Sequence, residues 1–136
     1  MYYFYKKNMK RNLIITAVLG ILAIILGAFG AHALKESLGP DALQSFETGV
    51  RYQMYHVILL LFINTYSEFS NKTKNSISLV FFIAILFFSG SIYAITIGGI
   101  DPKLIWFVTP LGGLLFIIGW VFMLKEFIYF HLFFSF

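Results

Sequence analysis

Four long apolar stretches, separated by short polar segments, dominate the pattern of this chain. They cover residues 13–34, 50–66, 77–98 and 104–124. Each is close to the roughly 20 residues that an α-helix needs to cross about 30 Å of hydrocarbon at about 1.5 Å per residue. The pattern therefore predicts an all-α membrane protein built as a bundle of four transmembrane helices.

Composition supports this assignment and shows how little of the chain lies outside it. The 136 residues are 60% hydrophobic and 12% charged, against about 45–50% and about 25% in soluble domains. We expect a cytoplasmic segment over residues 1–12, a transmembrane domain over residues 13–125, and an aromatic tail over residues 126–136 that lies along the membrane interface. The absence of cysteine excludes disulfides and thiolate chemistry.

A segment rich in polar residues precedes the second apolar stretch and runs into its start. A helix is expected to start at Gly39-Pro40-Asp41, because proline suits the first helical position. In its early part, apolar residues form a stripe along one side of the helix and polar residues cover the other sides. This arrangement is typical of an interfacial amphipathic helix that leads into the membrane. Glu47 and Arg51 are spaced for a helical ion pair, with the acid first.

Small residues recur at helical spacing and predict close helix packing, which in lipid replaces the missing hydrophobic drive between helices. The packing positions are Gly20, Ala23, Gly27, Gly30, Ala31, Gly90, Ala94, Gly98, Gly112 and Gly113. We expect them to pack within one bundle, and the alternative is that one stripe joins two copies of the chain. Pro110, inside the fourth stretch, predicts a helix kink.

Basic residues set the expected orientation. Seven of them lie on the side of the two termini, namely Lys6, Lys7, Lys10, Arg11, Lys72, Lys74 and Lys125. Three lie on the other side, namely Lys35, Arg51 and Lys103. Cationic loops favour the cytoplasm, so both termini are expected there. Because these charges flank apolar stretches rather than share one solvated face, the net charge of +4 does not indicate nucleic acid as a partner. A cleavable signal peptide ending at Ala31-His32-Ala33 is the competing interpretation of the first stretch.

One group of polar side chains is expected at the outer membrane boundary. It comprises His32, Glu47, Arg51, Tyr52, Gln53, His56, Ser89 and Tyr93. Such groups are costly in lipid, so they should contact neighbouring helices, a wet cavity or lipid headgroups. The group is thus either structural or a contact site for a ligand or lipid.

The candidate chemistry in this group is sparse. His32, Glu47 and His56 lack the spacing of a metal site, and general acid–base catalysis by His56, as in an enzyme acting on lipid, is less expected than a structural hydrogen bond of this side chain. We therefore predict no metal, no cofactor and no catalytic residue. A small transporter or channel that uses Arg51, Tyr52, Gln53 and His56 is the alternative to a non-enzymatic membrane component.

Four blocks of the chain carry a resemblance to a known family. They are Gly27-Ala28-Phe29-Gly30-Ala31-His32-Ala33-Leu34, the run from Phe46 to His56, Phe88-Ser89-Gly90-Ser91-Ile92-Tyr93, and Thr109-Pro110-Leu111-Gly112-Gly113 with Gly119-Trp120. With these blocks in this order, the chain resembles the YgdD/YwdK-like family of small membrane proteins, which is similar also to eukaryotic transmembrane protein 256.

The resemblance implies a four-helix, multi-pass protein of the bacterial cell membrane, in a family without an established activity. It carries over no catalytic residues. The residues that match the family blocks are His32, Arg51, Tyr52, Gln53, His56, Ser89, Tyr93 and Pro110. We expect a non-enzymatic component that packs with lipid, with a second copy of itself or with another membrane protein.

Overall fold

The computed structural model describes the backbone of residues 2–134 and the side chains of residues 8–133, and this part of the chain is helical throughout apart from short connections. The helices, in order, are α1 (Tyr2–Ala31), α2 (Ala33–Ser37), α3 (Pro40–Thr65), α4 (Asn71–Thr96), α5 (Pro102–Ile105) and α6 (Val108–Phe134). The predicted all-α fold is thus confirmed.

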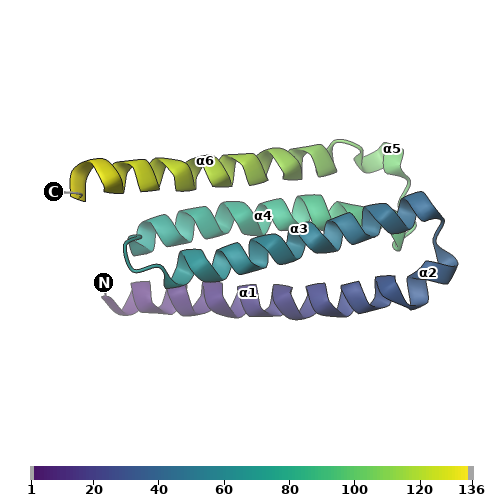
Figure 1. The fold of residues 1–136 in the computed structure, drawn as a ribbon, viewed down its shortest axis with the longest axis horizontal. Coiled ribbons are helices and arrows are strands. Elements are labelled where there is room, and N and C mark those ends of the chain that lie inside the picture. The colour runs from purple at the N-terminus through teal and green to yellow at the C-terminus, as the bar shows by residue number, and fades with distance from the viewer. Residues whose placement is uncertain (1, 135–136) are drawn as a thin grey trace.

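The four long helices run alongside one another, and the chain reverses direction between each and the next (Figure 1). Helix α1 packs mainly against α3, α3 against α4, and α4 against α6. The two ends of the chain lie at the same end of the bundle, and the short helices α2 and α5 lie at the other (Figure 1).

Three helical stretches in the described residues are long and apolar enough to cross a membrane. They are Asn8–Ala31 with 24 residues, Asn71–Thr96 with 26, and Pro102–Phe133 with 32. Helix α3 has 26 residues, but its charged and polar residues keep it outside this set. The fold therefore supports three of the four predicted spans by composition.

Helix α3 starts where the sequence indicates. Gly39 is its N-cap and Pro40 its first residue, which confirms the predicted start. Proline is suited to this position because the first N–H groups of a helix have no acceptor within it. One continuous helix then runs from this polar segment through the second apolar stretch to Thr65.

The predicted kink at Pro110 stays a prediction, because this residue lies at the start of α6 and not in the interior of a helix. The break in the fourth stretch falls earlier, at Trp106 and Phe107 between α5 and α6. Pro110 is in the first turn of α6, where its missing N–H costs no helical hydrogen bond. Helix α6 then continues to Phe134, so the described part of the aromatic tail extends this helix and is not a separate element.

A hydrophobic core forms where α3, α4 and α6 meet. Its buried side chains are Leu60, Ile63, Phe69, Ile77, Phe81, Ala84, Ile85, Phe116 and Met123. Many large apolar side chains outside this core are exposed, among them Ile14 and Ile24 at 65% each. Such a surface suits hydrocarbon rather than water.

Glycines allow the close approach of α1 to α3 and of α6 to α4. A Cβ at Gly30 would lie 3.0 Å from the Phe46 ring, and one at Gly112 would meet the Phe88 backbone. Gly90 and Gly98 differ from the prediction, because the atoms nearest to their Cβ positions belong to α4 itself. Helix α4 meets the glycines of α6 through Phe81 and Phe88, which lie against Gly119 and Gly112. Gly90 and Gly98 lie outside this contact.

Candidate functional site

Gln53 joins three helices through its side-chain amide. Its Nε2 donates to the backbone carbonyl of Leu19 in α1 at 2.8 Å, and its Oε1 accepts from the Tyr93 hydroxyl of α4 at 2.8 Å. The side chain is only 3% exposed. A buried amide with donor and acceptor both satisfied fixes the relative register of α1, α3 and α4.

Ser89 adds a second polar link between α3 and α4. Its hydroxyl donates to the carbonyl of Gly49 at 2.7 Å. Gly49 allows this approach, because a Cβ there would lie 3.1 Å from the Tyr93 ring and 3.3 Å from Ile92. We call Gly49, Gln53, Ser89 and Tyr93 the glutamine layer.

His56 lies next to this layer, between α3 and α6. Its Nδ1 is 2.7 Å from the Tyr52 carbonyl, and its Nε2 accepts from the indole Nε1 of Trp120 at 3.3 Å. A carbonyl can only accept, and the indole can only donate, so this pattern assigns the proton to Nδ1 of a neutral ring. The ring also stacks on Phe116, with centroids 3.7 Å apart.

The remaining members of the predicted polar group are not brought together with the glutamine layer. His32, Glu47 and Arg51 are exposed, and Tyr52 is 40% exposed while its ring contacts Phe88. Arg51 donates to the hydroxyl of Thr48 at 3.2 Å. The predicted ion pair between Glu47 and Arg51 is not formed between these two described residues, and the guanidinium instead reaches Thr48, three residues earlier on the same helix.

A second buried polar layer, which the sequence reasoning missed, lies towards the end of the bundle that holds both termini. Asn12 of α1 donates through Nδ2 to Oδ1 of Asn64 in α3 at 3.1 Å and to Oδ1 of Asn75 in α4 at 2.9 Å. Asn64 in turn donates to the Ser78 hydroxyl at 2.8 Å and to the Leu60 carbonyl at 2.9 Å.

We call Asn12, Asn64, Asn75 and Ser78 the asparagine layer. Asn12 is 2% exposed and Asn64 is 1% exposed. The available signal was Asn64, a carboxamide in the apolar run that follows His56 in the second stretch. Its partners could not be found by spacing, because Asn12 lies just before the first predicted span and 52 residues away.

The buried side chains of both layers are satisfied. Within the described part of the chain, every buried side-chain nitrogen or oxygen has a hydrogen-bond partner. The same described residues contain no cluster of three or more His, Cys, Asp or Glu that could hold a metal ion. The arrangement is chemically suited to holding helices in register, since neither layer presents an unpaired buried group to a reactant.

Together, the three long apolar helices, the apolar exterior and the polar layers between helices define a multi-pass helical membrane protein. The chain belongs to the family described as protein of unknown function (DUF423), whose model matches residues 26–113. This establishes the family resemblance seen in the sequence blocks.

Named relatives agree with this membership. The chain is 38% identical to a UPF0382 membrane protein of Staphylococcus aureus, over 85% of this chain and 93% of the relative. It is 38% identical to the UPF0382 membrane protein YwdK of Bacillus subtilis, over 83% and 92%. It is 34% identical to the UPF0382 inner membrane protein YgdD of Escherichia coli, over 82% and 85%. No solved structure matches the chain.

Proposed function

We propose that the protein is a non-enzymatic component of the bacterial cell membrane that crosses the bilayer four times and acts through its lipid-facing or partner-facing surfaces. The observation that carries this proposal is the position of Gln53, whose donor and acceptor groups are both used between helices. This use of the buried amide of the predicted site supports a role in helix packing.

Helix α3 is proposed as the fourth span. Its buried polar side chains Gln53, His56 and Asn64 all have protein partners. Its exposed residues in the same region are large and apolar or aromatic, and they are Tyr52, Tyr55, Ile58, Leu61 and Phe62. The outward face of α3 is therefore compatible with hydrocarbon, although its overall composition is more polar than that of its neighbours.

Both termini are proposed to lie in the cytoplasm. Lys10 and Arg11 of α1, Lys72 of α4 and Lys125 of α6 are all near the end of the bundle where the chain begins and ends. The opposite end carries fewer basic residues. The positive-inside rule favours placing the more basic end on the cytoplasmic side.

Single cysteines test the fourth span and the orientation together, because the natural chain has no cysteine. Ser37 follows α1 and Ser67 follows α3, and both are exposed. In intact bacteria, a membrane-impermeant maleimide should label Ser37→Cys and spare Ser67→Cys, which should react only after lysis. Labelling of both from the same side would show that α3 does not cross.

Transport is not favoured because the polar atoms of Gln53 and His56 are occupied by protein groups. A Gln53→Cys variant should resist water-soluble thiol reagents from both sides of the membrane. Rapid labelling of this variant, with a folded protein, would contradict the packing role.

A further inference from the structure

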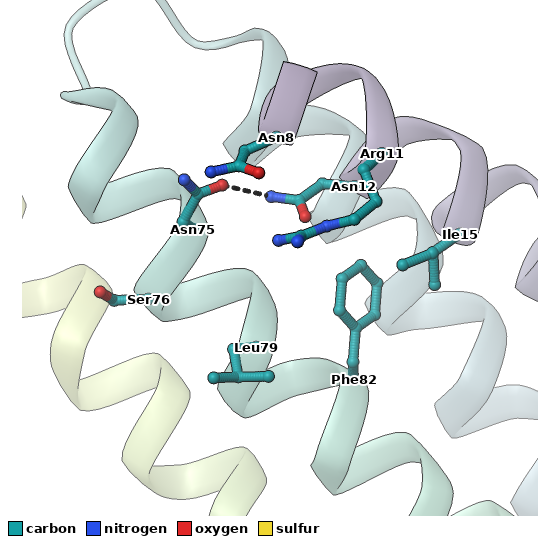
Figure 2. Close-up of a pocket in the computed structure, with 8 residues that line it drawn as sticks. All are labelled: Asn8, Arg11, Asn12, Ile15, Asn75, Ser76, Leu79 and Phe82. Atoms are coloured by element: carbon teal, nitrogen blue, oxygen red, sulfur yellow. Dashed lines mark hydrogen bonds between the residues drawn. The ribbon is translucent and has the colours of Figure 1, made fainter. Parts of the chain in front are cut away.

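A groove runs between α1 and α4 from the end of the bundle that holds both termini. Its first part is a cavity of about 380 Å³ with a polar wall that includes Asn8, Arg11 and Asn75 (Figure 2). A second cavity of about 360 Å³ continues it along the same two helices. Ile15 and Phe82 line both cavities, so the two are parts of one groove.

The polar end of the groove offers hydrogen-bond donors and a cation. Arg11 is exposed, and Figure 2 shows its side chain reaching from α1 into the cavity. Among the residues that the structure describes, it has no hydrogen-bond or ion-pair partner. No carboxylate lines this cavity. Its charge and donors therefore complement an anion.

The asparagine layer orients one of these donors. Oδ1 of Asn75 accepts from Asn12, which leaves the Asn75 amide nitrogen available to donate. Asn12 is itself held by Asn64, and both are almost completely buried. The orientation of the Asn75 amide is therefore set by hydrogen bonds within the protein before any ligand arrives, which lowers the ordering cost of binding.

Between its two polar ends, the groove is apolar over about the length of one membrane leaflet. The apolar lining on α4 extends from Leu79 to Gly90, roughly 16 Å at about 1.5 Å per residue. This matches half of a hydrocarbon core of about 30 Å. Beyond the apolar lining, Gln53 and Tyr93, which are hydrogen-bonded to each other, line the far end. At Gly90 a Cβ would meet only Leu86 of the same helix, at 3.7 Å, so the glycine leaves the groove open there.

We propose that this groove binds one anionic glycerophospholipid, with the phosphate on Arg11 and Asn75 and one acyl chain along the apolar part. Basic pockets between transmembrane helices on the cytoplasmic side are suited to such headgroups. This inference deepens the proposed function and rests on its cytoplasmic placement of the termini, because that placement puts the polar end in the inner leaflet.

Native mass spectrometry of the full-length protein in a non-ionic detergent tests the headgroup contact. Dioleoyl-phosphatidylglycerol and dioleoyl-phosphatidylcholine are titrated in separate series, and the Kd of the first bound lipid is measured for each. Arg11→Gln should weaken phosphatidylglycerol binding about tenfold, because the variant loses a charge-assisted hydrogen bond to the phosphate. Lys10→Gln removes the same charge from the neighbouring, exposed position outside the cavity, and it should change the Kd several-fold less.

A second variant tests the acyl contact without touching the charge. Gly90→Leu fills the groove and should also weaken the first lipid, whereas Ala17→Leu, on an exposed part of α1 outside both cavities, should not. Equal Kd values for Arg11→Gln and Lys10→Gln would overturn the proposal. Displacement of the lipid by millimolar inorganic phosphate would overturn it too, because the site would then take a free anion.

The assay separates this inference from the proposed function. Binding in detergent does not depend on the direction of insertion, whereas the Ser37 and Ser67 labelling does. If labelling places the termini outside the cell while the groove still selects phosphatidylglycerol, the orientation and the assignment to the inner leaflet fail, and the binding of an anionic lipid in the groove is retained. If Ser37→Cys is labelled from outside and Ser67→Cys is not, but Arg11→Gln and Lys10→Gln bind phosphatidylglycerol with equal Kd, only the lipid site fails.

Discussion

Gly112 of α6 lies directly against the backbone of Phe88 in α4, so close that a Cβ on the glycine would collide with the Phe88 nitrogen and lie 2.7 Å from its Cα. The obstacle is backbone and not the end of a flexible side chain. The two helices can therefore accommodate a larger residue at position 112 only by moving apart.

Gly112→Ala should lower the free energy of unfolding by about 3 kcal/mol, the upper part of the range for overpacking. Gly113→Ala is the matched control, because a Cβ there would lie 3.8 Å from the Phe88 ring, an ordinary contact. Chemical or thermal unfolding in the same detergent measures both. Equal stability of the two variants would show that α4 and α6 do not approach at Gly112.

Asn64 should be the residue of the asparagine layer on which stability depends most. It accepts from Asn12 and donates to Ser78, so Asn64→Leu leaves two partners unsatisfied. Removing one side of a buried hydrogen bond costs about 1–3 kcal/mol. Thr65→Val, next to it but exposed and bonded only within α3, should cost much less in the same unfolding measurement.

Gln53 and Tyr93 should be energetically coupled. A double-mutant cycle with Gln53→Met and Tyr93→Phe removes the hydrogen bond of 2.8 Å from both sides. We expect a coupling energy of about 0.5–1.7 kcal/mol, the range for interhelical hydrogen bonds in membranes. Additive effects of the two substitutions would indicate that this hydrogen bond is absent in the bilayer.

The indole of Trp120 should report on His56. Because Trp120 donates to Nε2 of His56 at 3.3 Å, His56→Phe keeps a ring against Phe116 but removes the acceptor. In a spectrum of protein labelled with nitrogen-15 tryptophan, the Trp120 indole proton should move upfield. Trp106 is the internal control, since it lies on the connection between α5 and α6, and its signal should stay in place.

Some properties follow from residue order alone. The long apolar stretches determine that the chain is helical and membrane-bound, because a bilayer demands internally satisfied backbone over about 20 residues. Local chemistry also determines the start of α3 at Pro40. The family could be recognised from the sequence blocks, since they keep their order and spacing along the chain.

Other properties depend on how the helices meet. Gln53 and His56 stand in one polar run with Glu47 and Arg51, yet only the first two are buried, because α3 turns one side towards its neighbours. Similarly, spacing alone could not separate Gly112, which contacts another backbone, from Gly90, which does not.

The asparagine layer is the clearest case of a feature that only the tertiary structure decided. Asn12 and Asn75 are 63 residues apart and lie on different helices, so no local pattern links them. They meet because α1 and α4 start at the same end of an antiparallel bundle, and because a buried amide needs a partner wherever packing places it. Sequence thus determined which segments are helices and which of their residues are costly in lipid, whereas packing determined which of those residues became partners.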